Sequence, residues 1–510
     1  MNILFCSRNL SLIFCVCLIA TTTGHAQFPD QQTFERYAKT SMDEFKELLS
    51  LANDAHHPED IKNNVQWCER HFAARGFKLK RLKTPGAPLL LAETKSRQPN
   101  VKTVLIYLQI DGQPVDPSHW NQTNPYQAVL KHQGINGTWE EITWQSLNGE
   151  IDPEWRIFAR SASDAKGPVS MFLTAIDLMI HEKTEANFHL KVIMDFEEEM
   201  GSPNLPGAVT QYREELAADM LVIFDGPRHI SNLPTLTFGA RGISEITLEV
   251  FGPLNPQHSG HYGNYVPNPA MRLAQLIASM KDEEGRVTIP GFYHGIELSD
   301  EVKEVLKNVP DDEDFIKSSL GIATSDQVAS NYQESLQYPS LNVRGILSGW
   351  VRDEVRTIIP SSAIAEIDIR LVLESNPDRL IDLVASHIKD QGYYLTERPP
   401  TKEERTKYAR ICQFNANTSY QAFRTEFNSK IGVWLSTALS KAFGKAPIML
   451  RTSGGSIPIA PFVNELGVPA VTVPTVNRDN NQHSPNENIR LGNYIDGIKT
   501  IYAILTESLQ

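Results

Sequence analysis

With 510 residues, the chain exceeds the size at which a single hydrophobic core usually stops growing, so we expect more than one domain. A hydrophobic content of 41% and a charged content of 21% are typical of a globular protein and exclude an intrinsically disordered one. The net charge of −13, without a visible basic patch, disfavours nucleic acid as a partner.

The N-terminus has the pattern of a secretory signal peptide over residues 1–26. Arg8 precedes an apolar run over residues 10–20, and Gly24 and Ala26 offer the small residues of a cleavage site. A membrane anchor is the alternative, but the run is too short to cross about 30 Å of hydrocarbon. We therefore predict an exported protein, periplasmic or secreted, with no membrane span after removal of the leader.

Buried strands that alternate with helices are predicted for much of the remaining chain. Residues 30–80 are interpreted as mainly helical, ending near Gly76 before a strand that reaches residue 82, and another helix is expected over residues 169–180. Such alternation implies parallel strands with helical crossovers, an α/β fold. Residues 116–153 are rich in turn formers and tryptophan and are expected to frame the rim of an active site. The apolar runs interpreted as buried strands are residues 103–108, 189–194, 220–224 and 470–473.

The pattern changes after Asp225. Residues 244–250 and 365–372 alternate apolar and polar side chains, which is typical of a sheet with one face in solvent. Helices predicted over residues 269–280 and 377–391 would cover the other face.

We therefore expect an α+β lid over residues 239–430, inserted in a main domain. Residues 27–238 and 431–510 would form that main domain. Residues 285–340 and 398–430 are interpreted as acidic or mixed-charge elaborations of the lid.

The acidic run over residues 195–199 is the most informative stretch, because it directly follows a predicted buried strand. So many adjacent carboxylates repel one another unless protons or metal ions neutralise them. A solvated acidic loop is the alternative. Other predicted strands also end in possible metal ligands, and ligand sites of parallel sheets lie at the carboxyl ends of the strands. The residues expected to converge on a metal site are Asp164, Glu198, Glu199, Asp225 and His483.

Several motifs in a fixed order make the chain resemble the M20 metallopeptidases, which include carnosinase-like dipeptidases, carboxypeptidase G, aminoacylase and succinyl-diaminopimelate desuccinylase. The family motif His-x-Asp-x-x-Pro corresponds to residues 109–114, Asp-Asp/Asn-Lys-Gly to residues 164–167, and Glu-Glu-x-Gly-Ser to residues 198–202. The resemblance implies a zinc-exopeptidase-like catalytic domain with a mixed, mostly parallel sheet, and a lid that mediates dimerisation. The further matches, in family order, are Asp225, Arg241-Gly242, His258-Ser259-Gly260, residues 357–360 with Arg370, residues 454–458 and residues 483–487.

The resemblance assigns the ligands of a divalent metal centre. Asp164 would bridge two ions, since a carboxylate has two oxygens. Glu199 and His483 would complete one site, and Asp225 with Gln109 the other. Zinc is the expected metal, as one or two ions, with manganese or cobalt as alternatives.

The resemblance also assigns the chemistry. Glu198 would be the general base that takes a proton from a metal-bound water as this water attacks the scissile carbonyl. Asp111 would not bind the metal itself but would orient a residue that does.

The lid would contribute substrate contacts. In the family, the histidine of the His-Ser-Gly motif reaches the active site of a second subunit, so His258 would polarise the carbonyl oxygen in the transition state of a homodimer. Thr357 and Arg370 would bind the substrate carboxylate, and Ser456 would also contact the substrate. Without the resemblance, His258 would be interpreted as a surface-loop residue and Arg370 as an exposed strand residue.

Gln109 departs from the family pattern, in which a histidine ligand stands at this position. An amide carbonyl oxygen binds zinc more weakly than an imidazole, so the site with Asp225 should be the weaker one. Further departures are Asp195-Phe196, where many relatives have Glu-Gly, and Thr452-Ser453, where carnosinase-like members have Arg-Glu.

We therefore expect an exported, metal-dependent hydrolase that cleaves the amide bond of a small peptide or an N-acyl amino acid. The alternative is a catalytically weak or silent relative that binds peptides or amino-acid derivatives. A serine hydrolase is disfavoured because Ser456 and Ser259 lack a strand-turn-helix nucleophile elbow. Cys68 and Cys412, the cysteines outside the leader, are interpreted as packed thiols, although a disulfide between them stays possible.

Overall fold

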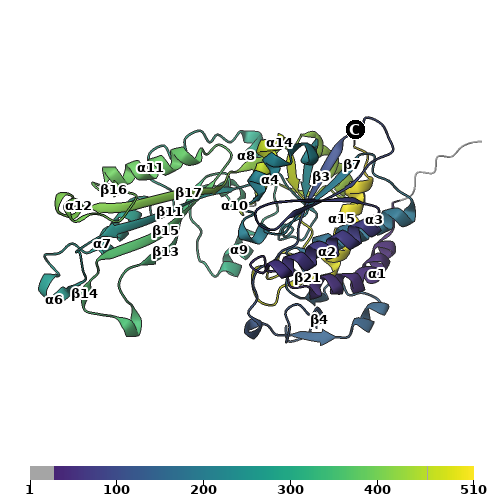
Figure 1. Ribbon diagram of the computed structural model, residues 1–510, viewed down its shortest axis with the longest axis horizontal. Helices are drawn as coiled ribbons and strands as arrows, with labels where there is room; N and C mark the ends of the chain where they lie inside the picture. Colours follow the sequence, from purple (N-terminus) through teal and green to yellow (C-terminus); the bar gives the residue numbers. More distant parts are fainter. Residues whose placement is uncertain (1–27, 456–457, 510) are drawn as a thin grey trace, which may run out of the picture.

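The computed structural model describes residues 28–455 and 458–509, which form two parts, each built around its own sheet (Figure 1). The predicted leader and Ser456, a predicted substrate contact, lie outside the described residues. Within the described ranges, no helix is long and apolar enough to cross a membrane.

The main domain contains an eight-stranded sheet with the order β1-β2-β7-β3-β8-β20-β9-β19. Its central strands β7, β3, β8 and β20 pair in parallel, whereas β1 and β2 add an antiparallel edge. The predicted α/β class with a mixed sheet is thereby confirmed. The strands are β1 Lys78–Leu82, β2 Leu89–Thr94, β3 Thr103–Gln109, β7 His189–Asp195, β8 Met220–Ile223, β9 Thr235–Thr237, β19 Ile448–Leu450 and β20 Ala470–Thr472.

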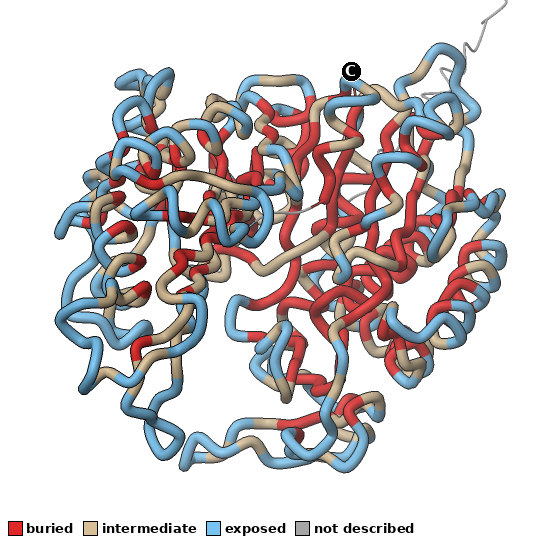
Figure 2. The backbone as a smooth tube through the Cα atoms, turned by 60° about the vertical axis from the view of Figure 1, so that its left-hand side comes forward, coloured by how far each residue is buried: buried red, intermediate tan, exposed pale blue. Residues whose placement is uncertain are grey.

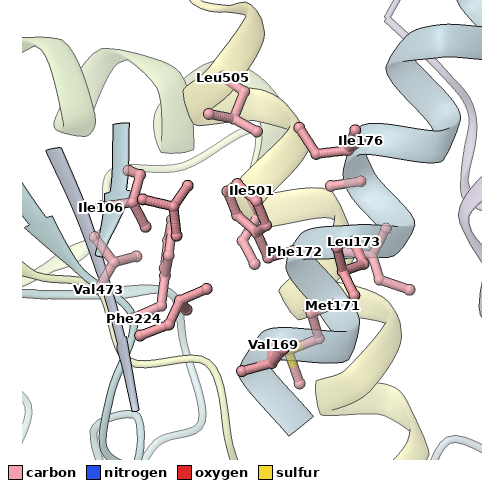
Figure 3. Close-up of a cluster of buried hydrophobic side chains, with 14 of the residues drawn as sticks. Ile106, Val169, Met171, Phe172, Leu173, Ile176, Phe224, Val473, Ile501 and Leu505 are labelled. Atoms are coloured by element: carbon pink, nitrogen blue, oxygen red, sulfur yellow. The ribbon is translucent and has the colours of Figure 1, made fainter. Parts of the chain in front are cut away.

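Helices cover both faces of this sheet, because its central strands are apolar on both sides. Along β3, Ile106 points to the face covered by the long helices, and Tyr107 points to the opposite face. Figure 3 shows the first face, where strand side chains such as Ile106 meet Phe172 of α3 and Ile501 of α15. The helices of the first face are α1 Gln31–Ser50, α2 Pro58–Ala74, α3 Lys166–Glu182, α13 Lys430–Phe443 and α15 Leu491–Thr506, and those of the second are α4 Leu205–Gln211, α5 Arg213–Leu216 and α14 Ala460–Leu466.

The predicted excursion over residues 116–153 contributes to a separate four-stranded sheet of order β21-β6-β4-β5. The backbone N–H of Asn121 donates to Oδ1 of Asn486 at 2.8 Å, so this segment lies against the loop that carries His483. The strands are β4 Val129–Gln133, β5 Trp139–Ile142, β6 Arg156–Phe158 and β21 Asn488–Arg490.

The lid is the part between the short paired strands β10 (Gly239–Ala240) and β18 (Phe423–Arg424), where the chain passes from one sheet to the other. Its five-stranded sheet has the order β13-β15-β11-β17-β16. The inward side chains of β11 and β15 are buried under α7 and α11, and Figure 2 shows the outer parts of the lid as largely exposed. The elements are β11 Gly242–Phe251, α7 Pro269–Ala278, β13 Ser340–Leu347, β15 Ser362–Leu371, α11 Pro377–Asp390, β16 Tyr394–Thr396, α12 Lys402–Lys407 and β17 Ile411–Tyr420.

The interpretation of residues 398–430 as a mere elaboration is wrong, because they contain β17, which pairs with β11 over most of its length. The strand was missed because its C-terminal half, Asn415-Ala416-Asn417-Thr418-Ser419, is mostly polar and largely exposed. Such a stretch lacks the alternation that identifies a half-buried strand.

The remaining lid segments lie at its two ends. The far tip carries β12 (Gln257–His258), α6 (Ser259–Tyr262) and β14 (Ile358–Ile359). Towards the main domain lie α8 (Asp300–Lys307), α9 (Glu313–Leu320) and α10 (Tyr332–Ser335), as Figure 1 shows. Cys68 of α2 and Cys412 of β17 are both buried free thiols, as interpreted from the sequence.

Candidate metal centre

Three neighbouring strands of the main sheet end at the candidate site. Gln109 is the last residue of β3, and Asp225 follows β8 by two residues. Glu198 and Glu199 lie in a single 3-10 turn, Glu198–Met200, shortly after β7. Because these strands are parallel neighbours, their carboxyl ends bring side chains from distant parts of the sequence to one edge.

Asp164, Glu199 and His483 form a group of possible metal ligands, with one donor atom from each lying within 4.8 Å of the others. Nε2 of His483 is 3.0 Å from Oδ2 of Asp164 and 3.3 Å from Oε2 of Glu199. His483 has a φ of 61°, and Asn481 and Asn486 of the same loop have φ of 55° and 61°. Positive φ is uncommon for residues other than glycine and concentrates at functional sites.

The donor set fits a divalent cation. Two carboxylate oxygens and one imidazole nitrogen are ligands that zinc takes in proteins. Oε1 of Glu199 is buried and has no hydrogen-bond partner among the described residues. Burial, followed by the charge of Asp164, raises the pKa of Glu199 to about 8 and that of Asp225 to about 7. A bound cation would relieve this repulsion and hold both carboxyl groups in their charged form.

Gln109 faces the cluster through its amide nitrogen. Nε2 donates to Oδ1 of Asp164 at 2.6 Å, and Oε1 is buried without a partner among the described residues. Reversing the amide would bring its oxygen against a carboxylate oxygen, which is electrostatically unfavourable. Gln109 therefore holds one oxygen of Asp164, the residue expected to bridge two ions.

Glu198 lies beside the cluster and is positioned by Asp111. The backbone N–H of Glu198 donates to Oδ1 of Asp111 at 3.1 Å, and that of Glu199 donates to Oδ2 at 3.0 Å. One buried carboxylate thus fixes the backbone of both glutamates. Burial, and then the charges of Asp225 and Glu199, raise the pKa of Glu198 well above its usual range.

The other two acids of the run serve the loop itself. Asp195 is buried and accepts hydrogen bonds from the Tyr107 hydroxyl at 3.0 Å and the Ser202 hydroxyl at 2.6 Å. Glu197 accepts from the backbone N–H of Ala87 at 2.8 Å. These contacts exclude the alternative of a solvated acidic loop.

Two positioning residues were missed in the list of candidates. Glu487 is buried, and its carboxylate accepts from the backbone N–H of Asp164 at 2.9 Å and from Nη1 of Arg160 at 2.8 Å. Nε2 of Gln113 donates to Oε2 of Glu199 at 2.8 Å. The sequence offered a signal for both, because Gln113 lies in the motif of residues 109–114 and Glu487 in that of residues 483–487, and each motif also contains a candidate ligand.

The lid residues fall into two groups. His258 and Thr357 are exposed and adjacent at the far tip, where the backbone N–H of Ser259 donates to the carbonyl of Thr357 at 3.3 Å. Figure 1 places this tip, marked by α6 and β14, far from β3 and β7. Within one chain, the structure therefore does not bring His258 or Thr357 to the metal ligands.

Arg370 lies at the opposite end of β15, towards the main domain. Arg241 links it to the loop that leads to Ser456: Nη2 of Arg241 donates to the carbonyl of Arg370 at 3.5 Å, and its backbone N–H donates to the carbonyl of Gly455 at 3.3 Å. Thr357 and Arg370 can therefore contact one substrate only if Thr357 comes from a second chain.

Comparisons with known proteins give a consistent result. The model of the M20 peptidase dimerisation domain matches residues 238–394. The human Beta-Ala-His dipeptidase is 27% identical over 84% of this chain and 78% of its own, and a Cys-Gly metallodipeptidase from Schizosaccharomyces pombe is 26% identical over 81% of each. The crystal structure of an M20 family metallo-carboxypeptidase from Sulfolobus solfataricus superimposes with a TM-score of 0.73 at 27% identity, covering 92% of this chain and 98% of that one.

A mixed sheet with possible carboxylate and imidazole ligands grouped beside its strand ends, together with an inserted lid, is typical of a divalent-metal-dependent hydrolase. The family model matches the lid, and the relatives match most of the chain. These matches confirm the resemblance to the M20 metallopeptidases that was found in the sequence. The chain carries an M20 peptidase dimerisation domain over residues 238–394, and over most of its length it is similar to metallopeptidases of that family.

Proposed function

We propose that this chain is a zinc-dependent enzyme that hydrolyses the amide bond of a small peptide or an N-acyl amino acid, with Glu198 as the general base. The observation that carries the proposal is the position of Glu198 beside the group of Asp164, Glu199 and His483, on a backbone held by Asp111. Its similarity to two kinds of dipeptidase supports a short peptide as substrate. Its action outside the cytoplasm is proposed from the predicted leader alone.

The residues would divide the work as follows. An ion held by Asp164, Glu199 and His483 would supply a Lewis acid that acidifies water and polarises a carbonyl. Glu198 would accept the proton of the attacking water and pass it to the leaving nitrogen. Arg370 would bind the substrate carboxylate, for which a guanidinium fork is well suited.

The test of this proposal is a substrate screen with the zinc-loaded protein. Dipeptides and N-acyl amino acids are incubated with the protein, and release of free amino acid is measured. We expect turnover of at least one of the two classes, its loss after chelation and its return when zinc is added back. Turnover that is unaffected by complete removal of metal would refute the proposal.

The second candidate, a silent peptide-binding relative, is favoured by one observation. The amide of Gln109 donates to Asp164 at 2.6 Å in the place of a family histidine ligand. Tight binding of dipeptides to the zinc-loaded protein without turnover of any member of the screen would support this candidate instead.

We further propose a homodimer that forms through the lid. Exposed apolar side chains gather near His258 and Thr357 at the lid tip, where Tyr265 is 86% exposed and Val351 is 72% exposed. Exposed apolar side chains that gather in one part of a surface are usual at protein interfaces. A second chain would cover it and deliver His258 and Thr357 to the site that contains Arg370.

A mixing experiment tests this arrangement. His258→Ala and Glu198→Gln are each expected to be inactive as homodimers, because each lacks one group in both sites. After the two are dissociated and reassociated in equal amounts, half of the dimers are hybrids with one complete site, so about a quarter of the wild-type activity should return. No recovery from hybrids whose formation is verified by mass spectrometry, or a fully active monomer in light scattering, would contradict donation between subunits.

A further inference from the structure

A cavity of about 780 Å³ opens directly beside Asp225. The loop after β8 and residues 452–454 form one side of it, and α9 and α10 form the other. This volume lies within the range of roughly 300–1,000 Å³ that is usual for small-molecule sites. None of the roles proposed above uses the α9 and α10 side.

The side chains that α9 and α10 present to this cavity are mostly apolar. Phe315 is 53% exposed, Leu320 is 66% exposed and Tyr332 is 39% exposed, and Ile316 and Leu336 are half-buried beside them. A wall of exposed apolar side chains is unfavourable in water and indicates a surface that a ligand covers.

Buried polar contacts hold this wall against the main domain. Oδ1 of Asp311 is 2.9 Å from Nε2 of His229, which follows Asp225 by four residues. Oδ2 of Asp311 accepts from Nε2 of Gln333 at 2.8 Å, which ties the start of α9 to α10. On the other side, Oε1 of Gln337 accepts from Nη1 of Arg451 at 2.6 Å. The wall is therefore fixed to both main-domain loops that border the cavity, so its shape is formed before any ligand binds.

Three of the charged residues that line the cavity, Asp479, Arg490 and Arg228, are engaged in ion pairs, so the apolar wall is the larger feature left to contact a ligand. Asp479 pairs with Arg156 at 2.6 Å and with Arg490 at 3.2 Å. Arg228 pairs with Asp496 at 3.0 Å.

We propose that this cavity is a specificity pocket that binds a bulky apolar side chain of the peptide substrate. The proposal rests on the proposed peptidase function, since Asp225 connects the pocket to the metal centre. It makes Phe315 and Leu320 the residues that determine specificity. Apolar dipeptides should therefore be preferred over diglycine.

Binding measurements test the pocket separately from catalysis. Zinc-loaded Glu198→Gln is titrated calorimetrically with Gly-Gly, Phe-Gly and Gly-Phe, so that no substrate is consumed. We expect one of the two phenylalanine dipeptides to bind at least about 10-fold more tightly than Gly-Gly. Adding Phe315→Ser or Leu320→Ser should reduce this preference by about 10-fold and leave Gly-Gly binding unchanged. The better of the two dipeptides identifies which substrate residue occupies the pocket.

Val433→Ser is the matched control, because Val433 on α13 is 55% exposed and does not line the cavity. It should leave the preference intact. The proposal is overturned if the phenylalanine dipeptides bind no better than Gly-Gly, or if Phe315→Ser weakens all three equally. If the pocket proposal fails in this way, hydrolysis of Gly-Gly by the wild-type protein would still support the peptidase function. If the preference for phenylalanine dipeptides is found but the wild-type protein hydrolyses no substrate, the peptidase function is refuted and the pocket proposal stands.

Discussion

Glu198→Gln is expected to reduce hydrolysis by roughly 10²- to 10⁴-fold, the usual loss when a general base is removed. The substitution keeps the size of the side chain and removes only its ability to accept a proton. Glu198 is not among the three residues whose donor atoms form the ligand group, so the zinc content should stay the same. Turnover of the best substrate from the screen and elemental analysis of the same preparation measure both effects.

Glu197→Gln is the matched control for the loss of one negative charge from the acidic run. Glu197 accepts from Ala87 and Asn204 and serves the loop, so its replacement should leave turnover within a few-fold of wild type. Near-wild-type turnover by Glu198→Gln would assign the base to another group. An equal loss in both variants would point to the charge of the run and not to a proton acceptor.

Gln109→His should raise the metal content from about one ion per chain to about two. In the structure, the Gln109 amide donates to Oδ1 of Asp164, so one oxygen of the expected bridging residue is engaged in a hydrogen bond. An imidazole would replace a donor by a metal ligand and leave that oxygen available beside Asp225. Because replacing groups that merely support a ligand changes metal affinity by about 10- to 100-fold, this change should tighten the second site by at least as much. Zinc titration followed by elemental analysis gives the stoichiometry without an activity assay.

Gln109→Asn is the control for this experiment, since it retains an amide and should not raise the stoichiometry. Two tightly held ions in the wild-type protein would show that the amide, or another group, is an adequate ligand. An unchanged stoichiometry in Gln109→His would mean that position 109 does not supply a ligand to a second ion.

Much of the main domain could be predicted from local sequence. Apolar runs such as residues 103–108 and 220–224 predicted buried strands, which the structure confirms as β3 and β8, and the ligand candidates directly follow these runs. The order of the motifs predicted a resemblance to the M20 metallopeptidases, and the comparisons confirm this resemblance. In contrast, β17 was missed because its polar C-terminal half carries no periodic signal, and only its pairing with β11 defines it as a strand.

The sequence by itself determined which residue types gather near the strand ends, because each candidate ligand lies within a few residues of an apolar strand or in a recognisable motif. Only the tertiary structure decided how they divide the work. Glu487 supports Asp164 across 323 residues of sequence, and Asp311 fixes α9 to His229 across 82. Such contacts depend on how separate elements pack, and a local sequence pattern contains no information about that packing. The same limit explains Gln109: its identity was visible in the chain, but only the fold shows that its amide nitrogen faces Asp164.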